Sequence, residues 1–147
     1  MRKFQPPLEG VLRVRTLAVR SREVDLARAR GALEKAERAR RETEAEIRLS
    51  LQGAPRGTVV QIRTLLDKDA ELRQLRMRLG REDEHFSVSN ARVDQERNRL
   101  LAARKEARAV EKLQARRYVE FLHMVTQLDQ KATDEVAART VRVGQAA

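Results

Sequence analysis

The chain has 147 residues, of which 37% are charged and only 3% aromatic, with no tryptophan. Such a composition is typical of long helical or coiled-coil proteins, because too few bulky side chains are present to fill a thick globular core. The net charge of +10 permits an acidic protein, nucleic acid or an anionic membrane surface as partner. The absence of cysteine excludes disulfides. No apolar run approaches the roughly 20 residues that cross a bilayer, and we expect no secretory signal.

The first predicted helix covers about residues 8–51, after an irregular start that contains Pro6 and Pro7. Apolar residues recur in it every seven positions. Seven residues make almost two turns of an α-helix, so the repeat lies along one line of the helix. Only Arg40 interrupts this row, which consists of Leu12, Val19, Leu26, Leu33, Arg40 and Ile47.

A turn is predicted at about residues 52–58, the only stretch that combines two glycines with a proline. Glycine and proline both interrupt helices. A short connection between two amphipathic helices favours an antiparallel hairpin.

The second predicted helix covers about residues 59–141 and contains no proline. About 80 residues make a helix on the order of 120 Å long, which cannot form a compact core alone and needs a partner helix. We therefore expect an all-α fold: a long antiparallel two-helix coiled-coil hairpin whose second helix extends beyond the first, forming a single domain over residues 1–147. Residues 80–90 have the lowest helical propensity in this helix. Beyond Arg139 the apolar periodicity is lost, and we expect the helix to fray. The apolar row is Leu65, Leu72, Leu79, Phe86, Val93, Leu100 and Ala107.

The register of the hairpin follows from the turn if Ile47 packs opposite Leu65. Arg40 then faces Leu72, and the same register brings Gly31 beside Gly80. In this arrangement the first helix extends back only to about Leu8, so residues of the second helix beyond about 104 lack a partner helix. They nevertheless carry one apolar helical face, which a bound protein, a second copy or a shifted register would have to cover. Its residues are Tyr118, Phe121, Leu122, Val125 and Ala132.

Few residues suggest catalysis. Two Glu-x-x-His pairs occur, and such pairs ligate metals in some helical bundles. Both lie on the same predicted helix, about 57 Å apart at helical rise, so they cannot form one site. No phosphate-binding glycine loop is present, and a two-helix hairpin offers no concave pocket. We expect no enzyme, no metal site and no cofactor. The two pairs are Glu82 with His85 and Glu120 with His123.

Two other functions fit the composition: a homodimeric structural coiled coil, and a basic helical protein that binds nucleic acid. Cations concentrate at residues 1–22 and 97–117. Acidic residues interleave with cations through almost all of the chain, and the sequence has neither a basic region preceding a leucine zipper nor an aromatic platform for base stacking. We therefore expect no nucleic acid as partner.

The end of the second predicted helix carries a recognisable set of residues between Leu100 and Ala137. They are the run Leu100 to Glu106, then Glu111, Lys112 and Leu113, then Leu128, Asp129, Gln130 and Lys131, followed by Asp134, Glu135, Val136 and Ala137. This set resembles the flagellar export protein family FliJ, and the resemblance covers essentially the whole chain in architecture.

The resemblance implies a non-enzymatic role in the flagellar type III export apparatus. Proteins of this family are similar to the central stalk of rotary ATPases. Their partners are the hexameric export ATPase, a membrane protein of the export gate and export chaperones. ATP hydrolysis would belong to the partner. The implied location is cytoplasmic, peripheral to the inner membrane at the flagellar base.

Two groups of residues are expected to make these contacts. By matching positions, the resemblance assigns the ATPase contact to Phe121, Val125, Leu128, Gln130, Lys131, Asp134, Glu135 and Arg139. For the export gate we choose residues beside the turn, namely Leu49, Leu51, Ile62, Leu65 and Leu66.

Overall fold

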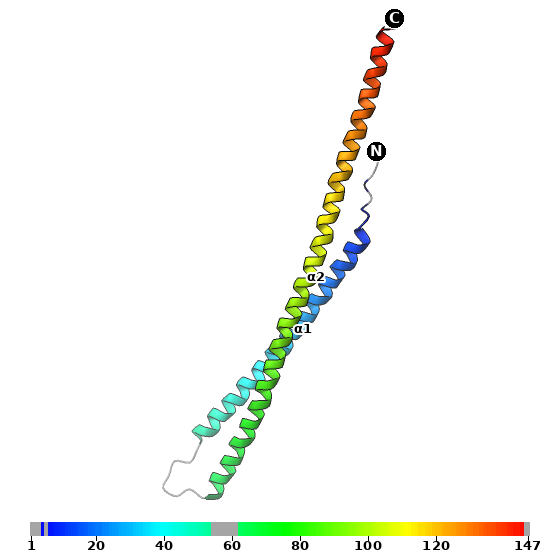
Figure 1. The fold of residues 1–147 in the computed structure, drawn as a ribbon. Coiled ribbons are helices and arrows are strands. Elements are labelled where there is room, and N and C mark those ends of the chain that lie inside the picture. Colours follow the sequence, from blue (N-terminus) through cyan, green and yellow to red (C-terminus); the bar gives the residue numbers. More distant parts are fainter. Residues whose placement is uncertain (1–3, 5, 54–61, 146–147) are drawn as a thin grey trace. The chain divides into compact units, whose positions relative to one another are not determined.

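The computed structural model describes residues 4, 6–53 and 62–145. These residues form two α-helices, α1 (Glu9–Gln52) and α2 (Ile62–Gln145), and no strand (Figure 1). The helices pack against each other, and α2 has 84 residues against 44 in α1. The predicted all-α fold with a longer second helix is confirmed. The chain divides into two units, which we call unit 1 (Met1–Val19 with Ala103–Ala147) and unit 2 (Arg20–Ala102).

The helix bounds are close to the predicted ones at the start of the chain. Helix α1 begins at Glu9, two residues after Pro7, and the Glu9 backbone N–H donates a 3.3 Å hydrogen bond to the Pro6 carbonyl. The predicted turn lies almost entirely outside the described residues, as do residues 59–61. Helix α2 continues to Gln145, beyond the predicted bound of about residue 141. Once a helix is nucleated, each further residue that is fixed adds one hydrogen bond. The fraying expected beyond Arg139 stays a prediction.

In unit 2, two rows of residues on each helix form the helix–helix interface. Members of each row lie seven residues apart, which is the repeat of a left-handed coiled coil. All of them are buried or half-buried. On α1 they are Leu26, Leu33, Arg40 and Ile47 with Ala29, Ala36, Thr43 and Ser50; on α2 they are Leu72, Leu79, Phe86, Val93 and Leu100 with Leu75, Glu82, Ser89 and Glu96.

This interface contains more polar groups than an ordinary coiled-coil core. Thr43 is completely buried, and its hydroxyl has no hydrogen-bond partner. Glu96 is also buried; one of its carboxylate oxygens accepts a 2.8 Å hydrogen bond from Arg99, and the other has no partner. Buried polar atoms without partners destabilise a fold. The polar residues therefore lower the stability that the heptad pattern alone suggests.

Cross-helix contacts in unit 2 fix the register and correct our prediction. The Arg40 guanidinium lies over the Phe86 ring, 5.6 Å from its centroid, and Arg40 Nε is 2.6 Å from an Asp83 carboxylate oxygen. We expected Arg40 to face Leu72, which precedes Phe86 by two heptads. The predicted pairing is therefore wrong by two heptads. A seven-residue pattern looks the same after any slide of seven residues, so it cannot select among such registers.

The glycine pair is not a point of close helix approach. With Arg40 opposite Phe86, Gly31 of α1 faces a part of α2 that lies about two heptads after Gly80. A Cβ atom added at either glycine would meet no heavy atom within 4 Å. The predicted juxtaposition of the two glycines is wrong for the same reason as the register.

The shifted register also appears in unit 1. Arg15 Nη1 on α1 is 2.5 Å from a Glu106 carboxylate oxygen on α2, and Phe4, ahead of α1, contacts Tyr118 and Phe121. The N-terminal part of the chain thus covers α2 as far as about Phe121. We expected the unpartnered part of α2 to begin near residue 104, and this is wrong. Counting only contacts between described residues, it begins near Leu122.

Candidate docking site

The part of α2 that follows Phe121 has exposed apolar side chains and no second helix beside it within the described residues of unit 1 (Figure 1). Leu122 is 45% exposed, Leu128 41% and Val136 61%, while Val125 is half-buried. The helix here is locally regular. The hydroxyls of Thr126 and Thr133 donate to backbone carbonyls one turn earlier, at 2.9 and 2.8 Å, which satisfies both side chains within the helix.

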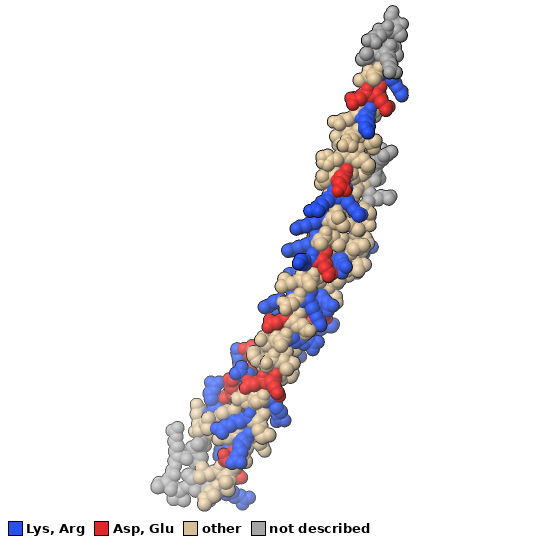
Figure 2. All heavy atoms as spheres, in the orientation of Figure 1, with Lys and Arg blue, Asp and Glu red and all other residues tan. Residues whose placement is uncertain are grey.

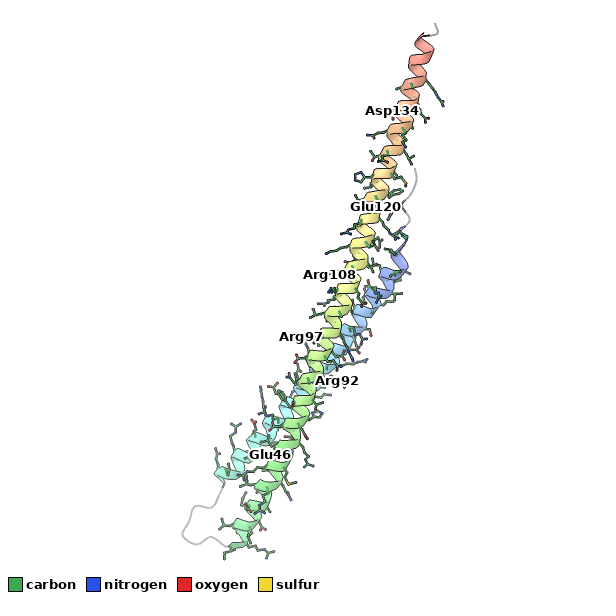
Figure 3. All side chains as sticks on the ribbon, in the orientation of Figure 1. Glu46, Arg92, Arg97, Arg108, Glu120 and Asp134 are labelled. Atoms are coloured by element: carbon green, nitrogen blue, oxygen red, sulfur yellow. The ribbon has the colours of Figure 1, made fainter. Side chains whose placement is uncertain are left out.

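The eight residues assigned to the ATPase contact do not share one face of α2. Successive residues of a helix are turned by about 100°, so residues three, four, seven or eleven positions apart share a side. Gln130 and Asp134 fall on the opposite side, and Lys131 lies at the edge (Figure 3 labels Asp134). We define the docking face by the five residues that this spacing groups together, namely Phe121, Val125, Leu128, Glu135 and Arg139.

Sequence reasoning missed Phe4, which precedes α1 and packs against this face of α2. Its ring packs edge-on against Tyr118, with centroids 5.2 Å apart and an interplanar angle of 72°. It also packs against Phe121, with centroids 5.3 Å apart. We call these three residues the aromatic cluster. The available signal was an aromatic residue two positions before a proline pair, in a chain with so few aromatics.

Charge changes along α2 within unit 1. Five cations between Ala103 and Phe121 form no ion pair with any described residue, namely Lys105, Arg108, Lys112, Arg116 and Arg117. Between Leu122 and Arg139 the acidic residues Asp129, Asp134 and Glu135 are mixed with the basic residues Lys131 and Arg139. In Figure 2 this part of the visible surface is mostly uncharged, with acidic and basic groups close together near the helix end. The docking face is therefore apolar at its start and mixed in charge at its end.

The residues assigned to the export gate lie in unit 2 and are all exposed. Leu49 and Leu51 are near the end of α1, and the other three are in the first turns of α2. Ile62 is the most exposed, at 76%. Exposed large apolar residues in such number are typical of a protein-binding surface.

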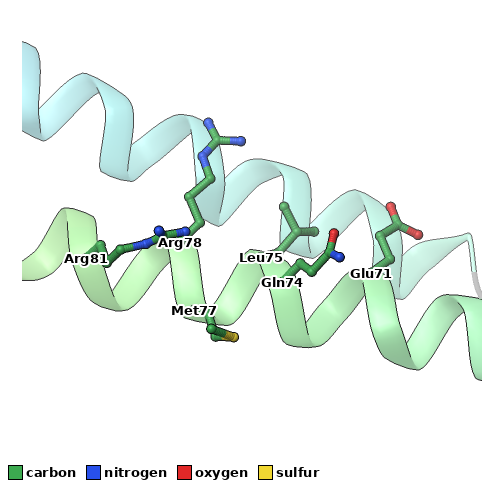
Figure 4. Close-up of a pocket in the computed structure, with 6 residues that line it drawn as sticks. All are labelled: Glu71, Gln74, Leu75, Met77, Arg78 and Arg81. Carbon is green, nitrogen blue, oxygen red and sulfur yellow. The ribbon is translucent and has the colours of Figure 1, made fainter.

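A shallow groove of about 350 Å³ lies a few turns further along α2. In Figure 4, Glu71 and Arg78 point toward α1 and Met77 points away from it. Arg78 donates to Glu82 and to Glu46, both at 3.1 Å, and the Glu82 hydrogen bond together with the Glu46 charge raises the pKa of Arg78. Two of the lining residues, Arg78 and Glu71, are thus engaged in ion pairs, and none of the residues assigned to a partner lines the groove.

Two further observations concern metal binding and membrane spanning. Within residues 4, 6–53 and 62–145, no group of three or more His, Asp or Glu side chains lies close enough to hold a metal ion. Neither helix, over its described length, is long and apolar enough to cross a membrane.

The fold defines a class of protein: a two-helix coiled coil that exposes large apolar side chains near both ends of its second helix. The family model described as "Flagellar FliJ protein" matches residues 4–146. The chain therefore belongs to the flagellar FliJ protein family, and it is a component of flagellar protein export. Searches of curated proteins and of solved structures found no match.

Proposed function

We propose that this protein is a central-stalk component of the export apparatus, and that its docking face binds inside the hexameric export ATPase. The observation that carries the proposal is the apolar side of α2 beyond Phe121, which no helix of its own chain covers among the described residues. Exposure of an apolar helix face to water is unfavourable, so we expect a partner protein to bury it in a groove or pocket. ATP hydrolysis belongs to the partner.

We further propose that the exposed residues beside the turn bind the membrane protein of the export gate, and that the protein helps to deliver export chaperones and their substrates. The two predicted surfaces belong to different units of the chain. On this proposal the protein acts in the cytoplasm, peripheral to the inner membrane at the flagellar base. Its contribution is to bind and position its partners.

Substitution on the docking face tests the ATPase contact. Leu128→Asp places a charge in the middle of the face, and we expect it to weaken binding to the purified ATPase by at least about 10-fold, as for a central interface residue. Val88→Asp is the matched control, because Val88 is also exposed on α2 (66%) but lies in unit 2. A chain truncated after Lys112 should lose binding altogether. Undiminished binding of the truncated chain or of Leu128→Asp would defeat the assignment.

A further inference from the structure

The docking face already carries an aromatic side chain from the start of the chain. The sequence contains only three phenylalanines and one tyrosine, and three of these four residues form the aromatic cluster. Phe4 is half-buried although it precedes α1. Part of the surface assigned to the ATPase is therefore covered by the protein itself.

We propose that Phe4 is a displaceable occupant of the docking face, and that the partner binds by replacing the Phe4 ring with an aromatic or large apolar side chain of its own. This inference rests on the proposed function, because it concerns regulation of the same surface. In the closed state Phe4 covers Phe121; in the open state Phe121 and Tyr118 are free to contact the partner.

The position of Phe4 shows which chemistry the face accepts. The edge-to-face contact with Tyr118 is a favourable aromatic geometry, and the contact with Phe121 adds a second ring. Arg117, exposed and without an ion pair among the described residues, lies one turn before Phe121. The partner segment is therefore an apolar side chain of about the size of phenylalanine with acidic neighbours, since a nearby cation favours them.

The backbone around Phe4 explains how it can occupy the face and still leave it. Pro6 and Pro7, two and three residues after Phe4, have fixed φ angles, and the Glu9 N–H to Pro6 carbonyl bond ties them to α1. A restricted segment loses little entropy when its ring is ordered. The contact nevertheless involves one side chain, so a partner that buries more of the docking face replaces it. At equilibrium, the apparent affinity for the partner equals the intrinsic affinity multiplied by the fraction of molecules in the open state.

Tyr118 allows the contact to be measured directly. It is the only tyrosine, and the chain has no tryptophan, so near-ultraviolet circular dichroism and fluorescence report on this cluster. We expect Phe4→Ala to change the Tyr118 signal while far-ultraviolet circular dichroism stays constant. Val14→Ala is the control, since Val14 is an exposed apolar residue of α1 (65%) outside the cluster. A Tyr118 signal that is the same in wild type and Phe4→Ala would overturn the inference.

A peptide with the sequence of residues 1–12 provides an independent check. Added to the full-length Phe4→Ala chain, it should restore the wild-type Tyr118 signal, because its own phenylalanine can take the vacated position. The same peptide carrying Phe4→Ala should not. Equal effects of the two peptides would show that the ring is not what the face binds, and would contradict the inference.

Binding to the purified export ATPase then separates this inference from the proposed function. Phe4→Ala should bind about 3- to 10-fold more tightly than wild type, the range expected from losing one weak competing aromatic contact, and Val14→Ala should bind as wild type does. If the wild-type chain binds and Phe4→Ala binds equally or more weakly, only the inference fails. If the wild-type chain does not bind at all, the proposed function fails and the inference fails with it.

Discussion

Thr43 illustrates how single residues set the stability of this helix pair. It occupies a central position of the interface in unit 2, where coiled coils ordinarily place an apolar residue. Its side chain is completely buried, and its hydroxyl has no partner. The hydroxyl is therefore desolvated without compensation, which costs more than burial of an apolar group of the same shape.

Replacement of this residue by valine removes the hydroxyl and keeps the shape. We expect Thr43→Val to raise the free energy of unfolding by about 1 kcal/mol, as measured by thermal or urea denaturation. Thr126→Val is the control, because the Thr126 hydroxyl is bonded to the Leu122 carbonyl in an exposed position, so no gain is expected there. A loss of stability in Thr43→Val would show that the buried hydroxyl has a partner after all.

At the scale of the helices, charges beside the interface select the register that the heptads leave open. Arg40 pairs with Asp83, and Arg78 pairs with Glu46. A slide of one heptad toward a shorter turn would instead bring Arg40 beside Arg76 and Glu46 beside Glu71. Two attractive pairs would become two repulsive ones, although the apolar rows would still match.

Engineered disulfides can read this register, since the natural chain contains no cysteine. Leu33 and Val93 are related in the same way as Arg40 and Phe86, one heptad away on each helix. We expect the Leu33→Cys/Val93→Cys variant to form an intramolecular disulfide on mild oxidation, detected by non-reducing electrophoresis. The Leu33→Cys/Leu79→Cys variant tests the register predicted from the sequence, which differs by two heptads, and it should stay reduced. The opposite pattern would contradict the register described here.

The sequence predicted the helices well because each has a long apolar repeat at helical spacing. It did not predict their register, because Leu65, Leu72 and Leu79 are equivalent to a seven-residue pattern. Arg40 was treated as a break in the row, whereas its partners Asp83 and Phe86 were the evidence for register. Phe4 was missed because a short segment ahead of a helix has no periodicity from which a contact can be inferred.

The eight residues assigned to the ATPase contact do not share one side of α2, and their role in docking stays a prediction. A motif resemblance follows consecutive positions along the chain, whereas a helix presents residues three or four apart on the same side. Gln130 and Asp134 therefore entered the predicted set with Phe121 and Leu128, although the helix turns them to the other side.

At the scale of the whole molecule, the two proposed partners use surfaces in different units of the chain. Substitutions that are well separated and share no contacts act independently. We expect Ile62→Asp with Leu66→Asp to weaken binding to the cytoplasmic part of the gate protein by about 10-fold or more and to leave ATPase binding unchanged. Leu128→Asp should do the reverse. Pull-down assays with each purified partner measure both effects, and loss of both interactions in either variant would contradict separate surfaces.

Hydrogen exchange of α2 tests the central claim, that the apolar side beyond Phe121 is the surface which a partner covers. In the free protein, backbone amides of residues 122–139 should exchange faster than those of residues 86–107, which pack against α1. Addition of the purified export ATPase should slow exchange in residues 122–139 and leave the control region nearly unchanged. Unchanged exchange over residues 122–139 in an ATPase complex that has demonstrably formed would contradict the account.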